Sequence, residues 1–133
     1  MKKTTLYISL CLTALLAGCI DSPSITGSND VTEYTTAQFE VTEIIGETTR
    51  LTARGIVENT GTTTYYAVWY IEGDFYADNT YDFKLGGDRY SFTFALEPGE
   101  KTGWELEFTS SLYTESEYPD FAVKNLRAFT DSN

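Results

Sequence analysis

Acidic side chains are the most abundant charged groups in this 133-residue chain, and one group of them could bind calcium. Four oxygen-bearing side chains lie close together in a predicted loop: Asp74, Asp78, Asn79 and Asp82. Oxygen-rich loops can hold calcium, but this spacing is not that of an EF-hand. Acidic loops are also common in a chain with 20 acidic residues. We expect no metal site, with calcium at Asp74, Asp78 and Asp82 as an alternative.

A second acidic group could catalyse hydrolysis, because paired carboxylates can act as general acid and general base. Its members are Glu97, Glu100, Glu105 and Glu107. Glu105 and Glu107 alternate with large apolar residues, which indicates a solvated strand face rather than a cleft. We therefore expect no enzyme activity, and a carboxylate-dependent hydrolase is the last alternative.

The composition excludes several other kinds of site. The chain has no histidine, so it cannot form a Ser-His-Asp or Cys-His nucleophile or a histidine zinc site. Its net charge of −11 repels nucleic acid, which argues against a nucleic-acid partner. We expect no cofactor.

Aromatic side chains are the remaining candidates, because exposed rings make a platform for a protein or a glycan. Six form a band along the chain: Tyr65, Tyr66, Trp69, Tyr70, Tyr76 and Tyr81. Tyr65 and Tyr66 are neighbours in a predicted strand, so they cannot both point inward. We predict a ligand or partner surface that includes Tyr66, Tyr70 and Tyr76, and also Tyr113 in the polar loop 110–120. The alternative is that these rings fill the core and ordinary sheet faces.

The elements that carry these residues are predicted to be short strands. Apolar residues recur with the period of a strand in segments 36–44, 51–59, 64–72, 81–85, 89–96, 102–108 and 121–129. Turns are predicted at 45–48, 59–61, 86–88 and 96–100. No segment has a long helical period. The pattern predicts an all-β fold, an antiparallel β-sandwich of seven to eight strands.

The start of the chain has the organisation of a secretory signal peptide. Lys2 and Lys3 precede an apolar run from Leu6 to Ala17, which is shorter than the roughly 20 residues needed to span a bilayer. Cleavage before Cys19 would leave seven basic residues against 20 acidic ones and change the net charge from −11 to −13. Residues 20–30 are rich in Ser, Gly, Pro and Asn, which favours a flexible tether.

Leu16-Ala17-Gly18-Cys19 resembles the lipobox of prokaryotic lipoproteins. The resemblance implies cleavage before Cys19 and diacylglycerol on its sulfur. Two or three acyl chains on one residue give stable membrane anchoring. We expect a signal peptide at 1–18, the lipidated Cys19 and tether at 19–34, and the sandwich at 35–130. The protein would face outside the cytoplasm, on the cell membrane or on the outer membrane if the organism has one.

The segment from about Thr35 to Phe129 resembles the FxLYD family, immunoglobulin-like domains of bacterial and archaeal surface proteins. The matching positions are Gly55, Val57, Asn59, Gly61, Phe75, Tyr76, Leu96, Pro98, Gly99 and Glu100. Ala77 stands where the family usually has Asp, and the stretch 80–90 is longer than the family's connection. The telokin-like immunoglobulin fold of small lipoproteins is similar in the same turns. Both resemblances imply an immunoglobulin-like sandwich, and neither implies a catalytic residue.

These observations predict a membrane-anchored surface lipoprotein, a non-catalytic binding or assembly module of the cell envelope. Its expected partners are the membrane, through the lipid anchor, and an envelope protein or glycan. The alternative is a structural spacer or envelope-stability protein without a ligand. An exposed aromatic patch distinguishes the two, because a binding module needs one and a spacer does not.

Overall fold

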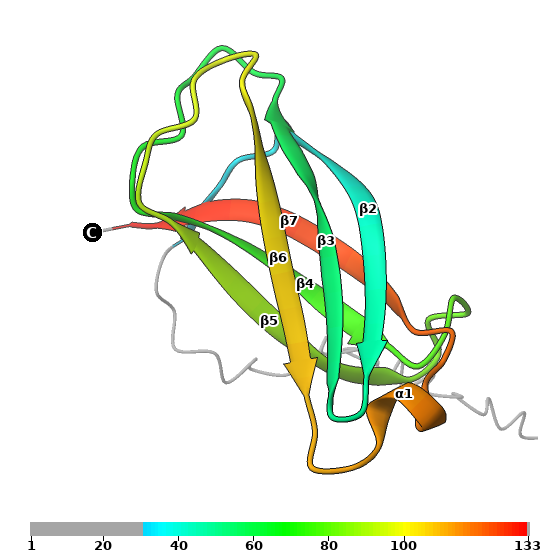
Figure 1. Ribbon diagram of the computed structural model, residues 1–133. Coiled ribbons are helices and arrows are strands. Elements are labelled where there is room, and N and C mark those ends of the chain that lie inside the picture. Colours follow the sequence, from blue (N-terminus) through cyan, green and yellow to red (C-terminus); the bar gives the residue numbers. More distant parts are fainter. Residues whose placement is uncertain (1–30, 133) are drawn as a thin grey trace, which may run out of the picture.

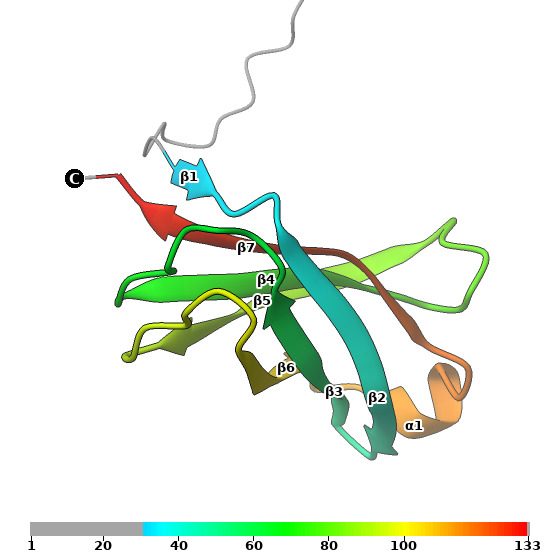
Figure 2. The same ribbon diagram turned by 90° about the horizontal axis from the view of Figure 1, so that it is seen from above.

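The computed structural model describes residues 31–132, in which seven strands form two antiparallel sheets (Figure 1). The strands are β1 (Val31–Glu33), β2 (Ala37–Glu47), β3 (Arg50–Asn59), β4 (Trp69–Tyr76), β5 (Lys84–Phe92), β6 (Lys101–Thr109) and β7 (Ala122–Asp131), and a short helix, α1 (Thr114–Glu117), precedes β7. The strand orders are β1-β7-β4-β5 and β2-β3-β6. Figure 2 shows the two sheets as stacked layers. The predicted immunoglobulin-like β-sandwich is confirmed. Within residues 31–132 no helix is long and apolar enough to cross a membrane.

Side chains of alternating direction build the core, as the period of two predicts. In β4 the inward residues are all buried: Trp69, Ile71, Gly73 and Phe75. The outward residues of the same strand are half-buried: Tyr70, Glu72, Asp74 and Tyr76. Trp69 stacks on Phe92 of the neighbouring strand, with ring centroids 3.9 Å apart. The polar side chains of β4 that are accessible to solvent therefore lie on its outer face.

The predicted turn at Gly86-Gly87-Asp88 is wrong, because these residues lie inside β5. Glycine serves close packing here: a Cβ at Gly86 would meet the Phe108 ring at 2.9 Å. Asp88 joins the two sheets, since its carboxylate accepts a hydrogen bond from the Glu107 N–H at 2.7 Å. The end of the predicted segment 81–85 and the first half of the segment 89–96 therefore belong to one continuous strand.

The segment 64–68, predicted as the first part of a central strand, is instead a loop before β4. Within this loop, Tyr65 forms an isolated antiparallel β-bridge with Leu96, which lies between β5 and β6. The predicted polar loop 110–120 contains α1, which the period did not indicate. Thr114 fixes this helix, because its hydroxyl donates to the Glu47 carbonyl at 2.7 Å and its side chain is buried.

The N-terminal end of the described chain is part of a sheet. Val31 lies opposite Asp131 in the β1–β7 pair, so residues 31–33 of the segment 19–34 form a strand of this sheet. The predicted signal peptide, Cys19 and residues 20–30 of the predicted tether lie outside the described residues.

Candidate binding surface

Tyr65 and Tyr66 point in opposite directions, as predicted. Tyr65 is 1% exposed, stacks on Tyr34 with centroids 4.0 Å apart, and shares a 2.9 Å hydrogen bond with the Thr36 hydroxyl. Burial raises the pKa of Tyr65 above its ordinary value. Tyr66 is 68% exposed. The chain thus anchors one ring in the core and presents the next to solvent.

Tyr70 lies on the outer face of β4 and is held in place by its neighbours. Its ring stacks on Phe129 of β7, with centroids 5.5 Å apart. The guanidinium of Arg89 lies 4.9 Å from the Tyr70 centroid and 4.8 Å from that of Phe129. Cation–π contacts of this kind are attractive. The Tyr70 ring is therefore packed between its neighbours and only part of it faces solvent.

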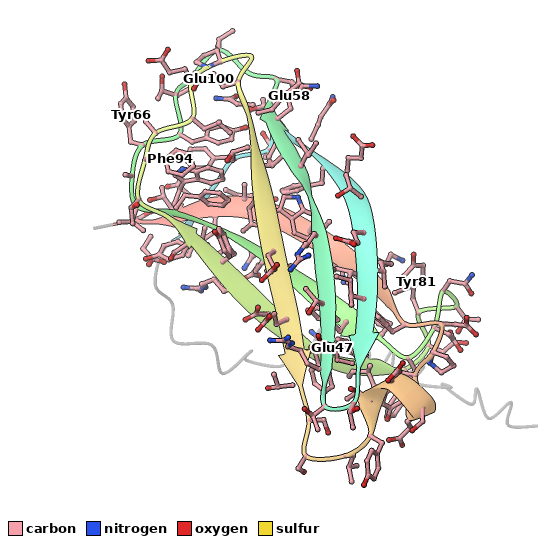
Figure 3. The ribbon with its side chains drawn as sticks, in the orientation of Figure 1. Glu47, Glu58, Tyr66, Tyr81, Phe94 and Glu100 are labelled. Carbon is pink, nitrogen blue, oxygen red and sulfur yellow. The ribbon has the colours of Figure 1, made fainter. Side chains whose placement is uncertain are left out.

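The other two predicted tyrosines lie elsewhere. Tyr76 is at the end of β4, where it meets Tyr81 edge-on at 5.4 Å and accepts a hydrogen bond from the Asn125 amide at 3.3 Å. Tyr113 is 70% exposed at the start of α1. Figure 3 shows Tyr66 and Tyr81 near opposite ends of the molecule. The structure does not bring the four predicted tyrosines together.

Tyr66 instead shares one end of the sandwich with two apolar side chains that the sequence analysis did not single out. Val68 is 46% exposed and Phe94 is 50% exposed. Figure 3 shows Phe94 and Tyr66 at the same end of the molecule. The indole N–H of Trp69 donates to the Phe94 carbonyl at 2.8 Å, which ties the loop after β5 to the start of β4. We call Tyr66, Val68 and Phe94 the aromatic end. The sequence did not predict that Phe94 is exposed. Phe92 and Phe94 are two residues apart, so the strand period predicts that both are buried, as Phe92 is.

An open groove of about 390 Å³ adjoins the aromatic end; it is lined by Ala67, Val68, Tyr70, Thr130 and Asp131. Two of the lining residues are joined directly, because the Thr130 hydroxyl donates a hydrogen bond to the Val68 carbonyl at 3.0 Å. Val68 belongs to both features. Of the predicted tyrosines, Tyr70 thus lines the groove and Tyr66 belongs to the aromatic end.

Two of the three aspartates of the calcium alternative, Asp74 and Asp78, are engaged with separate partners. Asp74 accepts from the Lys84 ammonium at 2.7 Å and from the Asn125 amide at 2.9 Å. Burial opposes ionisation of Asp74, but these two donors outweigh it and hold its pKa below the ordinary value. Asp78 accepts from the hydroxyl and the N–H of Thr80, which lowers its pKa as well. Across residues 31–132 no cluster of three or more acidic or cysteine side chains could hold a metal ion.

The glutamates of the hydrolase alternative do not face one another across a cleft. Glu105 is paired with Arg54 and Glu107 with Arg50 on the outer face of the β2-β3-β6 sheet. Glu100 accepts a hydrogen bond from the Glu97 N–H at 2.9 Å within a turn.

A second open groove, of about 350 Å³, also contains carboxylates: its lining is Glu72, Gly73, Asp74, Gly87, Asp88 and Arg89. Each of its three carboxylates has a partner, namely Arg127 for Glu72, Lys84 for Asp74 and the Glu107 N–H for Asp88. For Asp74 these donors hold the pKa below its ordinary value, which makes this carboxylate a poor general acid.

No family model and no curated protein matches the chain. Among solved structures, the fold is similar to part of a β-glucosidase from Kluyveromyces marxianus, with 16% sequence identity and a TM-score of 0.40. The match covers 75% of this chain and 14% of that chain. A likeness this distant carries no argument about activity.

Proposed function

We propose that this chain is a lipid-anchored surface protein of the cell envelope whose sandwich is a non-catalytic module that binds a protein partner. The lipid anchor rests on Leu16-Ala17-Gly18-Cys19 and the basic, apolar start before it. Membership of the FxLYD family stays a prediction from the turn residues. The binding role rests on one observation, the exposure of the aromatic end.

The exposure of Tyr66, Val68 and Phe94 supports a binder over a spacer. Apolar surface left in water costs about 25 cal/mol per Å² relative to burial, and a spacer gains nothing from it. Contiguous exposed apolar residues with a polar rim are typical of interaction sites. Val68 and Phe94 have no side-chain hydrogen-bonding group, which favours the apolar side chains of a protein partner over a glycan.

A glycan is the second candidate, favoured by the groove beside the aromatic end. Its lining residues include Thr130, Asp131 and Tyr70. Polar groups next to an aromatic ring could orient a sugar.

Affinity capture from envelope extract tests the proposal. The full chain, with a C-terminal tag, is extracted in mild detergent and compared with the double variant Tyr66→Ser, Phe94→Ser. The matched control is Leu112→Ser, Tyr113→Ser, which removes two side chains of similar exposure, 62% and 70%, from another part of the surface. Thermal unfolding establishes that all three proteins are folded.

We expect a protein that is retained by the wild type and by the control and is lost from the Tyr66→Ser, Phe94→Ser variant. Retained material that is lost on glycosidase digestion would replace the protein partner with a glycan. Equal retention by all three folded proteins, or none by any of them, would contradict the role of the aromatic end and favour the spacer.

A further inference from the structure

Strand β2 is an edge strand whose backbone is open along one side. Its only ladder within the described residues is the one to β3, and Figure 1 shows it at the outer side of the sheet. Every second residue of such a strand directs its N–H and C=O away from its neighbour. In residues 31–132 no other backbone–backbone bond reaches the stretch from Gln38 to Gly46. An added strand could pair there.

The outer face of this sheet carries rows of charge that alternate across the strands. In one row Glu43 of β2 lies opposite Arg54 of β3, which lies opposite Glu105 of β6. Arg54 is ion-paired with both carboxylates, so one cation serves two anions.

A second row repeats the arrangement. Arg50 of β3 is ion-paired with Glu47 of β2 and with Glu107 of β6. Glu40 of β2 has Ile56 opposite it and no cation. In the parts of the face that contain Arg54 and Arg50, acid, base and acid follow one another from β6 to β2, which leaves negative charge at the open edge. The row at the other end differs, because Lys101 of β6 is paired with Glu58 of β3. Opposite charges on neighbouring strands stabilise their pairing, so the next strand in this order is a basic one.

The inward side of the same edge is apolar and incompletely covered. Val41 lies opposite Gly55 and Ile44 opposite Ala53, both of which are buried inner-face positions of β3. Yet Val41 is 39% exposed and Ile44 is 49% exposed. An added strand with apolar residues on its inner side would cover them.

Two other occupants fit this edge poorly. A second copy pairing through its own β2 would bring two strands that each carry Glu40, Glu43 and Glu47 side by side, and like charges on neighbouring strands are destabilising. Residues 20–30 of this chain contain two aspartates and no basic residue, so they would add negative charge to a negative edge.

We propose that the β2 edge binds an extended segment of a partner protein in which basic and apolar residues alternate, with the basic side chains next to Glu43 and Glu47 and the apolar ones over Val41 and Ile44. Main-chain hydrogen bonds supply the binding, and the alternation sets its specificity. This edge shares no residue with the aromatic end, so an experiment can disprove binding at one site without disproving binding at the other.

A synthetic peptide that alternates valine and lysine, acetylated and amidated, is the probe. Its binding to the full chain in detergent is followed by fluorescence anisotropy, and hydrogen exchange locates it. The first control peptide has the same composition with its lysines grouped in one half. The second carries N-methyl groups on one backbone edge. The charge variant is Glu43→Arg, Glu47→Arg, and its matched control is Asp82→Arg, Glu97→Arg, with the same change in net charge on exposed residues elsewhere.

We expect the alternating peptide to slow hydrogen exchange in β2 and not in β6, and the grouped and N-methylated peptides to bind at least tenfold more weakly. Two exposed ion pairs are worth about 1 kcal/mol together, so Glu43→Arg, Glu47→Arg should weaken binding about fivefold or more. The Asp82→Arg, Glu97→Arg control should bind like the wild type.

Equal affinity for the alternating and grouped peptides would show attraction to net charge alone and overturn the proposal. Protection of β6 instead of β2, or equal weakening by both double variants, would overturn it as well. Loss of peptide binding in the Tyr66→Ser, Phe94→Ser variant would assign the peptide to the aromatic end.

Discussion

Asn59 is a buried side chain whose role is structural. It is 0% exposed, and its amide nitrogen donates to the Thr63 carbonyl at 2.8 Å and to the Leu96 carbonyl at 3.0 Å. Its amide oxygen accepts from the Gly61 N–H at 3.1 Å. One side chain therefore holds the loop after β3 against the segment before β6. This accounts for Asn59 without implying any ligand, and the close approach of Thr36, at 2.5 Å from a Cβ placed on Gly61, accounts for the glycine.

Asn59→Asp keeps the shape of this side chain but removes its two N–H donors. It also sets a carboxylate against the carbonyls of Thr63 and Leu96. Each lost hydrogen bond is worth about 1 kcal/mol and an unpaired buried charge costs more, so we expect a loss of at least about 3 kcal/mol in unfolding free energy. Urea unfolding measures it, with the exposed Asn79→Asp as control. A change below about 0.5 kcal/mol at Asn59 would contradict this role.

Asp74 should make the stability depend on pH in the acidic range. Its folded-state pKa lies below the ordinary value because the Asn125 and Lys84 donors outweigh the effect of burial. Such a carboxylate stabilises the fold above its unfolded pKa of about 3.9, and this contribution is lost as pH falls through the folded pKa. Asp74→Asn should therefore cost about 1 kcal/mol at pH 7 and progressively less below about pH 4. A cost independent of pH, in urea titrations at several pH values, would refute the assignment.

At the scale of the strands, Gly55 decides how closely β2, β3 and β6 approach. A Cβ on Gly55 would lie 2.0 Å from the Glu40 carbonyl oxygen and 2.4 Å from the Trp104 ring. Neither the backbone of β2 nor a buried indole can move without loss of pairing or packing.

Gly55→Ala should thus destabilise the domain by about 3 kcal/mol or more, as overpacking of a core does. Gly103→Ala is the control, because it lies on the adjoining strand with its nearest contact at 3.8 Å. There a side chain is accommodated, and the change should be neutral or slightly stabilising. Thermal unfolding of the two variants gives the comparison, and similar melting temperatures would be inconsistent with the close approach at Gly55.

Much of the fold was predictable from alternation, and the failures have local causes. Segments 51–59, 102–108 and 121–129 became β3, β6 and β7 because one of their faces is buried. Gly86 and Gly87 were read as a turn because glycine favours turns, whereas Gly86 lies in β5 to admit the Phe108 ring. Tertiary packing decides between these uses of glycine, and a single sequence does not show it.

The candidate site was predictable only in part, for a related reason. Exposure of Tyr66 follows from its adjacency to Tyr65, since neighbours in an extended chain face opposite ways. Exposure of Val68 and Phe94 depends on where β4 begins and where β5 ends, at Trp69 and Phe92. Strand ends are set by the hydrogen bond from Trp69 and the packing around it, which periodicity alone does not encode.

At the scale of the whole molecule, the start of the described chain, at β1, lies on the same side as the aromatic end. Val31 pairs with Asp131, and Asp131 also lines the groove beside Val68. Figure 2 shows β1 beside the C-terminal end of β7. As the predicted flexible tether, residues 20–30 would span roughly 20 Å on average. A partner bound at the aromatic end would then lie close to the membrane, which favours another envelope protein over a distant soluble one.

The anchor itself gives the most direct prediction for the whole chain. Cys19→Ser removes the sulfur that the lipobox resemblance assigns to the lipid, so the protein should lose its acyl chains and leave the membrane fraction. Cys11→Ser is the matched control, because Cys11 lies within the predicted signal peptide and its loss should change neither property. Intact-mass spectrometry measures the lipid, and membrane flotation measures the attachment. Without the burial of acyl CH₂ groups, each worth about 0.8 kcal/mol, a domain of net charge −13 has no attraction to anionic lipid and should become soluble. If Cys19→Ser stayed membrane-bound, or if Cys11→Ser lost its lipid equally, the anchor would lie elsewhere. The aromatic end would then be the first surface to test for membrane contact, because it lies on the same side as β1.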